Sequence, residues 1–335
     1  MFEDQAIVVT GAAGFIGANI VKGLNARGHR RVIAVDDLSD GDKVANLADC
    51  EICDYVDRDE FMRRLRDGDF DDEVGAILHQ GACSDTMESD GRYMMLNNYR
   101  YSVTLLEHCQ DNDIPLLYAS SASVYGAGTV FREQRDCEAP LNVYGYSKFL
   151  FDEYVRRTLA DRTAPIVGLR YFNVYGPREQ HKGRMASVAK HFFDQYCSEG
   201  RVRLFEGSGG YGDGEQRRDF IHVDDVVNAN LWFLDHPRLS GVFNLGTGKA
   251  ATFNAMAVAI INAVEKQRGG AERDLPALLG AGAISYVPLP EALAGKYQSF
   301  TEADLTALRH AGYSVPFAPV EEGAPRYVER LMAGR

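Results

Sequence analysis

A tyrosine and a lysine four positions apart, Tyr144 and Lys148, carry the clearest chemical signal in the sequence. Residues at i and i+4 share one face of a helix, so a helix over residues 144–159 would bring phenol and ammonium together. A free phenol has a pKa of about 10 and is a poor base at neutral pH. A neighbouring ammonium favours the phenolate and lowers that pKa, so the pair predicts an acid/base catalyst.

Two serines precede this pair at the end of an apolar run. Residues 115–120 (PLLYAS) predict a buried strand, and Ser121 follows it directly. Parallel α/β sheets place their chemistry at the carboxyl ends of strands. Ser121 could therefore bind the reacting oxygen, although Ser120 and Ser121 could also simply cap a turn.

A glycine-rich turn near the N-terminus carries the second chemical signal. Its sequence is GAAGFIG, with Gly11, Gly14 and Gly17, and it lies between a predicted strand over residues 6–10 and a predicted helix over residues 15–27. Glycines here allow a tight turn and a close approach of a pyrophosphate to the backbone, and the helix N-terminus then faces the phosphate charge. The context predicts a bound dinucleotide.

The end of the next predicted strand bears on which dinucleotide binds. Asp36 follows the turn by about twenty positions and suits a ribose 2′-hydroxyl, which favours NAD. Asp37 adds negative charge, whereas Lys43 could offset it and meet the 2′-phosphate of NADP. These residues alone leave NAD and NADP open.

Alternating strands and helices must position these groups. In the first half we expect strands over residues 6–10, 31–35, 76–79, 115–120 and 166–170, and helices over residues 15–27, 57–67, 92–112 and 144–159. Later we expect helices over residues 185–199 and 225–235, strands over residues 203–205, 219–222, 242–245 and 284–287, and a mobile glycine-rich binding loop over residues 207–214. This alternation predicts an α/β fold with a Rossmann-type, doubly wound parallel sheet and a smaller α/β substrate-binding domain. We expect the cofactor domain to cover residues 1–175 with 219–250 returning to it, and the substrate domain to cover 176–218 and 251–335.

Composition excludes several classes of protein. The chain has 335 residues, which predicts about two domains, and its 45% hydrophobic and 25% charged residues exclude disordered and fibrous chains. A net charge of -12 disfavours nucleic acid and anionic membranes as partners, but local basic residues could still bind a small anion. No apolar run approaches the ~18 residues of a membrane span, and no signal peptide is evident, so we expect a cytoplasmic protein.

Six cysteines are scattered through the chain. In a long cytosolic chain they are most simply free thiols. Cys50 and Cys53 have CxxC spacing, but neither a second pair nor a histidine cluster accompanies them. We therefore expect packed thiols here and no metal site.

Together with the glycine turn and the Tyr144–Lys148 pair, several segments resemble the extended short-chain dehydrogenase/reductase family of NAD(P)-dependent epimerases and dehydratases. The resemblance covers essentially the whole chain. It is strongest at residues 80–84 (QGACS), 141–148 (LNVYGYSK), 170–178 (RYFNVYGPR), 181–183 (HKG), 205–208 (FEGS) and 297–300 (YQSF). It implies a nucleotide-sugar epimerase that acts on an ADP-heptose during lipopolysaccharide inner-core synthesis and assembles as a homopentamer.

The resemblance also implies tightly held NADP. Two of the implied cofactor contacts depart from the family pattern, because Arg58 replaces a lysine and Gln80 replaces a glutamate. The implied contacts are Gly11, Gly14, Phe15, Ile16, Gly17, Asp36, Asp37, Lys43, Arg58, Gln80, Gly81, Ala82, Cys83, Ser84, Asn97, Lys148, Val174 and Lys182.

The resemblance further implies that Tyr144 and Lys182 are two acid/base groups, with Lys148 and Ser121 in support. Lys182 would need a lowered pKa, from burial or from neighbouring positive charge. From the residue alone, Lys182 could equally bind a diphosphate. The implied substrate contacts are Ser121, Asn173, Arg184, His191, Phe205, Glu206, Gly207, Ser208, Arg218 and Tyr297. Arg218 suits a bidentate diphosphate contact, whereas Arg184 stands where the family tends to have a serine.

The implied chemistry follows from the weak acidity of a C–H bond beside a hydroxyl. Oxidation makes that carbon planar, and return of the hydride to the other face inverts it. Each stereoisomer presents its hydroxyl differently, so two acid/base groups are expected. A UDP-hexose 4-epimerase remains an alternative on the same residues. A non-enzymatic dinucleotide sensor would lack the Tyr144–Lys148 pair, and a 4,6-dehydratase would need an acidic residue beside Ser121, where the sequence is SASVY.

Overall fold

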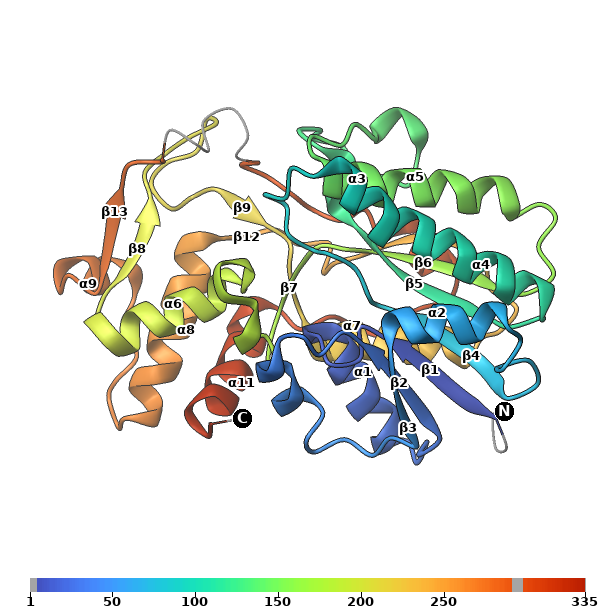
Figure 1. The fold of residues 1–335 in the computed structure, drawn as a ribbon. Helices are drawn as coiled ribbons and strands as arrows, with labels where there is room; N and C mark the ends of the chain where they lie inside the picture. Colours follow the sequence, from blue (N-terminus) through green and yellow to red (C-terminus); the bar gives the residue numbers. More distant parts are fainter. Residues whose placement is uncertain (1–4, 291–297, 335) are drawn as a thin grey trace.

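A parallel seven-stranded sheet forms the larger part of the molecule (Figure 1). The computed structural model describes residues 5–290 and 298–334. The strand order is β11-β6-β5-β4-β1-β2-β3, and the order reverses between β1 and β4, where α/β sheets bind their ligands. The strands are β1 (Ala6–Thr10), β2 (Val32–Asp36), β3 (Asp54–Asp57), β4 (Val74–His79), β5 (Leu116–Ser121), β6 (Ile166–Tyr171) and β11 (Gly241–Leu245). The predicted Rossmann-type fold class is confirmed.

Helices cover both faces of this sheet, because its central strands are apolar on both sides. On one face, α1 (Phe15–Ala26) and α7 (Val223–Leu234) share an apolar cluster with the sheet. On the other face, α2 (Arg58–Arg66), α4 (Tyr101–Asp111) and α5 (Val143–Thr158) form a second cluster. The short helix α10 (Thr306–His310) packs on the first face.

The smaller part has its own apolar cluster, at the left of Figure 1. It contains the parallel pair β8 (Val202–Phe205) and β13 (Ile284–Val287), with α6 (Val188–Glu199), α8 (Phe253–Gln267), α9 (Leu275–Gly280) and α11 (Val320–Met332). Two short ladders lie between the parts, β7 (Asn173–Tyr175) with β10 (Phe220–His222), and β9 (Arg217–Arg218) with β12 (Ala251–Thr252). The smaller α/β part is as expected, while the domain boundaries given above stay a prediction.

Several features differ from the sequence expectations, and the two-residue strands β9 and β12 are among those not predicted. The strands β3 and β7 were not predicted, because β3 is largely exposed and polar and β7 has only three residues. The helix expected over residues 92–112 is α3 (Gly91–Met94), a π-helical turn (Met95–Arg100) and then α4. A π turn shifts the hydrogen-bond pattern by one residue and leaves no clear periodicity in the sequence.

The glycine-rich loop after β8 is held by its own hydrogen bonds. The Gly207 N–H donates to Asp213 Oδ1 at 2.8 Å, and the Gly214 N–H donates to the Phe205 carbonyl at 3.0 Å. Within the described ranges, no helix combines the length and the apolar character needed to cross a bilayer.

Candidate active site

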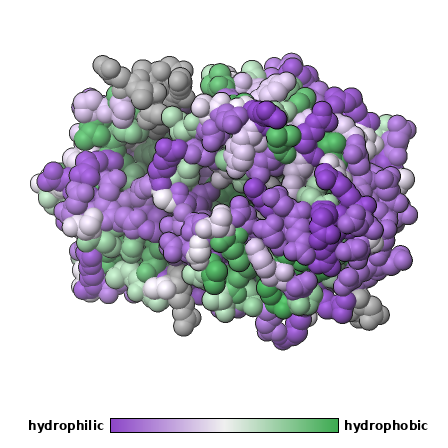
Figure 2. Space-filling view, viewed as in Figure 1, coloured by the Kyte–Doolittle hydropathy of each residue, from purple (hydrophilic) through white to green (hydrophobic). Residues whose placement is uncertain are grey.

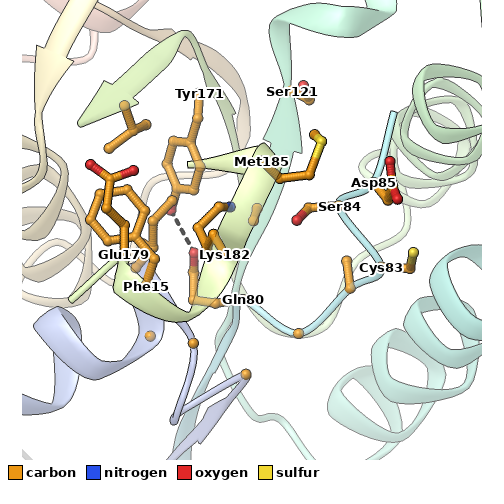
Figure 3. Close-up of a pocket in the computed structure, with 18 of the residues that line it drawn as sticks. Phe15, Gln80, Cys83, Ser84, Asp85, Ser121, Tyr171, Glu179, Lys182 and Met185 are labelled. Carbon is orange, nitrogen blue, oxygen red and sulfur yellow. Dashed lines mark hydrogen bonds between the residues drawn. The ribbon is translucent and has the colours of Figure 1, made fainter. Parts of the chain in front are cut away.

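A cavity of about 710 Å³ lies at the carboxyl ends of the central strands, on the side of the smaller part. Figure 2 shows a largely hydrophilic face that is hollowed between the two parts, and Figure 3 shows the cavity wall. All eighteen residues expected to contact the cofactor line this cavity. Tyr144, Ser121 and Asn173 line it as well.

The glycine turn forms one wall and fits a dinucleotide. Gly11 has a φ of +64°, and a Cβ atom there would lie 2.7 Å from the Gly81 backbone nitrogen. A Cβ atom at Gly17 would lie 2.0 Å from the Gly11 carbonyl oxygen. Side chains at either position would break the turn, so the backbone stays open to the cavity at the start of α1, where a pyrophosphate can bind.

The carboxylate of Asp36 is fully engaged by the protein. One oxygen accepts the Ala13 N–H at 2.7 Å, and the other accepts the Asp37 N–H at 2.7 Å and the Lys43 ammonium. Lys43 also donates to the Asp37 carbonyl at 2.6 Å. Lys43 thus compensates the charge that would repel a 2′-phosphate, and Arg58 adds a guanidinium 3.8 Å from Asp37.

The side chain of Gln80, which lines the cavity, has a hydrogen-bond donor available to a ligand. Its Oε1 accepts the Tyr171 hydroxyl at 2.9 Å, as the dashed line in Figure 3 marks, and Asn230 Nδ2 donates to that hydroxyl at 3.0 Å. The Gln80 Nε2 is buried and has no hydrogen-bond partner among the described residues. A buried donor without a partner costs about 1–3 kcal/mol, so Gln80 fits a cofactor that accepts this hydrogen bond.

The π-helical turn fixes the loop that follows β4. Asn98 accepts the Cys83 N–H at 2.9 Å and donates to the Cys83 carbonyl at 3.0 Å and to Ser147 Oγ at 3.2 Å. Its neighbour Asn97 accepts a hydrogen bond from Arg58 at 2.8 Å. The turn therefore joins the loop after β4 to α5, which carries the Tyr144–Lys148 pair.

Helix α5 is fastened along β5. Asn142 caps the helix by accepting the Gly145 N–H at 2.7 Å, and Lys148 Nζ donates to the Ala119 carbonyl at 2.8 Å. One turn further on, the buried Asp152 accepts Ser120 Oγ at 2.8 Å. These contacts hold Tyr144 and Lys148 at the end of β5, beside Ser121.

Burial changes the proton affinity of both members of the pair. It lowers the pKa of Lys148 to about 8, and the charge of Asp152 opposes this change. It raises the pKa of Tyr144, while a hydrogen bond with Ser121 lowers it. Desolvation of the phenolate has the largest effect on this pKa in the protein alone, and the lowering expected from Lys148 together with an oxidised nicotinamide ring stays a prediction.

Lys182 lies in the 3-10 segment Gln180–Met185, on the wall formed by the smaller part. Its Nζ lies 5.9 Å from the centroid of the Phe15 ring, which is cation–π range. Burial lowers the pKa of Lys182, and the charge of Glu179 opposes this. The direction agrees with the expectation, although burial alone lowers this pKa.

Most of the expected substrate contacts lie outside this cavity. Arg184 is 71% exposed in its side chain and pairs with Asp85 at 2.6 Å, and His191 Nε2 lies 3.3 Å from the Arg184 carbonyl. Arg218 is buried, with its guanidinium 5.8 Å from the centroid of the Phe253 ring. Phe205 ends β8, and Glu206, Gly207 and Ser208 begin the loop that follows, where Gln216 donates to the Glu206 carbonyl and to Ser208 Oγ. Tyr297 lies outside the described residues.

Several lining residues were not predicted from the sequence. Four of them had a signal in the sequence: Tyr171, Phe172, Glu179 and His181 lie within or beside segments that resemble the family. Others, such as Thr10 on β1, Tyr93 on α3 and Tyr101 on α4, are placed by the fold alone. The unpredicted lining residues include Thr10, Asp85, Thr86, Tyr93, Tyr101, Tyr171, Phe172, Glu179, His181 and Met185.

Cys83 lines the cavity, whereas the CxxC pair Cys50 and Cys53 lies elsewhere. All six cysteines are free thiols, and burial raises the pKa values of Cys50 and Cys53. Across residues 5–290 and 298–334, no three His, Cys, Asp or Glu side chains are grouped to hold a metal ion.

Comparison with known proteins gives one family and close relatives. The model of the NAD dependent epimerase/dehydratase family matches residues 7–246. The ADP-L-glycero-D-manno-heptose-6-epimerase of Thiobacillus denitrificans is 64% identical over 329 residues, which is 98% of this chain and 99% of the relative.

Solved structures agree in fold. The crystal structure of the Helicobacter pylori ADP-L-glycero-D-manno-heptose-6-epimerase is similar with a TM-score of 0.80 at 29% identity, covering 99% of this chain and 97% of that one. The UDP-glucose 4-epimerase of Thermotoga maritima, solved with UDP-glucose, has a TM-score of 0.76 at 27% identity, over 98% and 99% of the two chains.

Proposed function

The chain belongs to the NAD dependent epimerase/dehydratase family, and from this premise we propose that it is an ADP-heptose 6-epimerase. It interconverts ADP-D-glycero-β-D-manno-heptose and ADP-L-glycero-β-D-manno-heptose by inverting C6″, in the supply of heptose for lipopolysaccharide. The 64% identity to the Thiobacillus denitrificans enzyme, over nearly the whole of both chains, carries this proposal. The UDP-glucose 4-epimerase is similar at a far lower identity.

The cavity residues divide the binding of the cofactor among them. When bound, a nicotinamide dinucleotide supplies the hydride acceptor and donor of the reaction. The glycine turn would hold the pyrophosphate of this cofactor, and Gln80 Nε2 would donate a hydrogen bond to the cofactor. NADP is the preferred form, because Lys43 and Arg58 supply positive charge where a 2′-phosphate would lie and Asp36 is already engaged.

Two groups on different elements act as acid/base catalysts. Tyr144, on α5, takes the hydroxyl proton of one epimer, with Ser121 orienting that hydroxyl and Lys148 holding the helix to β5. Lys182, on the facing wall, does the same for the other epimer. Its pKa is lowered by burial, which favours the neutral amine that a base requires.

The remaining parts of the proposal concern substrate contacts, assembly and location. Asn173, which lines the cavity, contacts the sugar. The diphosphate and adenosine side of the substrate lies toward Arg218, Arg184, His191 and the loop from Phe205 to Ser208. We place the enzyme in the cytoplasm, as a homopentamer.

One incubation tests the reaction and the substrate together. The purified protein receives ADP-D-glycero-β-D-manno-heptose deuterated at C6″, in ordinary water, and the product is read by NMR and mass spectrometry. We expect the L-glycero epimer with its deuterium retained. Turnover of UDP-galactose in place of the heptose, or loss of the deuterium to water, would contradict the proposal.

A further inference from the structure

Lys182 is carried by a short loop whose two ends meet at one buried carboxylate. Glu179 is fully buried and lines the cavity, and Figure 3 shows it with Phe15 and Lys182 at one side of the pocket. We infer that Glu179 is the positioning residue for Lys182, because its carboxylate closes the loop 179–187 that carries this lysine. The inference deepens the proposed function and rests on it for the role of Lys182.

The carboxylate of Glu179 joins both ends of this loop. Its Oε2 accepts the Ser187 N–H at 2.5 Å, and its Oε1 accepts the Ser187 hydroxyl at 2.7 Å and the Gly176 N–H at 3.4 Å. Inside the loop, the Lys182 N–H donates to the Glu179 carbonyl at 3.0 Å. Ser187 in turn caps α6 by accepting the Lys190 N–H. One carboxylate thus ties the loop to β7 and to the first turn of α6.

Little else fixes the amine of Lys182. Within the described parts of the chain its Nζ makes no hydrogen bond or ion pair, and it lies 5.9 Å from the centroid of the Phe15 ring. The next residue, Gly183, is exposed and has a φ of +52°, and as a glycine it contributes no side chain to hold the loop. An acid/base group must be held closely to its reacting atom, and here that depends on the closed loop.

The negative charge of Glu179 also acts on the amine of Lys182. Glu179 is the carboxylate whose charge raises the pKa of Lys182 against burial, and it acts at a distance beyond an ion pair. The adjacent His181 carries its own lowered pKa, partly from the Lys182 charge. Tyr144, Lys148 and Cys83 also line the cavity, Arg184 of the same loop pairs with Asp85, and Tyr327 of α11 lies near Glu179. Removing the Glu179 charge should lower the Lys182 pKa further.

A double-mutant cycle tests whether Glu179 acts through Lys182. Glu179→Gln is compared with the wild type and with Lys182→Met, alone and combined, in the heptose assay. We expect Glu179→Gln to lower kcat by roughly 10- to 100-fold with little change in KM, and to add less than about threefold in the Lys182→Met background. Equal losses in both backgrounds would make Glu179 merely structural and overturn the inference.

Two further variants control for folding. Asp225→Asn removes another buried carboxylate, which accepts the Ala318 N–H at 2.9 Å and does not line the cavity. We expect it to lower the melting temperature without the kcat loss. If Glu179→Gln does not fold, Ser187→Ala removes one hydrogen bond to the same carboxylate, and a smaller kcat loss that vanishes with Lys182→Met is then the expected result.

A second measurement needs no turnover. The acylation of Lys182 by acetic anhydride is followed against pH by peptide mass spectrometry, in the wild type and in Glu179→Gln. The midpoint should move to lower pH in the variant, and an unchanged midpoint would overturn the inference. A wild-type protein that fails to epimerise the heptose would instead refute the proposed function, and the labelling would still test Glu179.

Discussion

Tyr144 and Lys148 lie one helical turn apart, yet burial moves their pKa values in opposite directions. Burial raises the pKa of Tyr144 and lowers that of Lys148 to about 8, because each charged form loses water. A hydrogen bond with Ser121 favours the phenolate of Tyr144, whereas the Lys148 ammonium donates to the Ala119 carbonyl. The tyrosine therefore depends on its partners in the cavity to act as a base.

Replacing Tyr144 by phenylalanine should remove most of the turnover and leave the fold intact. The hydroxyl is the only group lost, and removal of a general acid/base typically costs about 10²–10⁴-fold in rate. Epimerisation rate and bound nucleotide are measured on the same preparation. Tyr146→Phe is the matched control, since Tyr146 lies on the same helix with 44% of its surface exposed. A wild-type rate in Tyr144→Phe would remove this residue from the mechanism.

The residues that line the cavity were largely predictable, whereas their electrostatics were not. Glycines, Asp36 and Lys43 occur at fixed distances from recognisable strands, so their placement follows from the fold. The pKa of Tyr144 depends on how deeply α5 sits against β5, which no spacing reveals. Glu179 lay beside a segment that resembles the family, but its role depends on Ser187, eight residues away, and only the folded loop brings them together.

At the scale of elements, apolar runs decided what could be predicted. The strands β8 and β13 were expected separately, at residues 203–205 and 284–287, because each contains apolar residues, but their pairing was not predicted. By contrast, β3 (DYVD) pairs with β2 through backbone bonds and buries one residue of four. The π turn before α4 follows from tertiary contacts of Asn98 with the Cys83 loop, so the sequence showed only a helix.

The carboxyl end of β4 should make the fold sensitive to acid. His79 is buried between Thr10, at 2.6 Å, and Ser102, at 2.9 Å, and burial lowers its pKa from 6.5 to about 3. Between these values the unfolded chain binds a proton that the folded chain does not. The free energy of unfolding should therefore fall as the pH falls, by about 4 kcal/mol between pH 6.5 and 3.5 from this group.

Urea unfolding of the wild type and His79→Gln, across this pH range, measures the contribution. The variant should be less stable near pH 7, because it packs less well, but its stability should change less with pH. Parallel curves for the two proteins would show that other groups cause the acid sensitivity. His29→Gln, at a half-buried position outside the sheet, is the control.

At the scale of the whole molecule, charge is distributed unevenly. The chain carries a net charge of -12, yet four basic and four acidic side chains line the cavity. The basic ones are Lys43, Arg58, Lys148 and Lys182, and the acidic ones are Asp36, Asp37, Asp85 and Glu179. The excess negative charge therefore lies elsewhere, and the cavity remains compatible with anionic ligands.

Removal of the nucleotide should destabilise the molecule, because the cavity draws its walls from both parts. We expect the melting temperature to fall on removal and to recover by several degrees with NADP, and by less with NAD. Lys43→Ala should abolish the difference between the two nucleotides, while the exposed Lys266→Ala should preserve it. Equal recovery with NAD and NADP in the wild type would contradict the proposed preference. Differential scanning fluorimetry provides the measurement.

The strand β11, residues 241–245, forms one edge of the large sheet and pairs with β6. Between these two strands the chain leaves the sheet after residue 171 and forms elements of the smaller part. A fragment cut at residue 175 would keep β6, whose six residues are all buried, but would leave one flank of it bare. Such a bare flank recruits strands from other molecules. Dissecting this enzyme at residue 175 should therefore yield inclusion bodies, whereas a cut placed beyond β11 would keep that flank sealed.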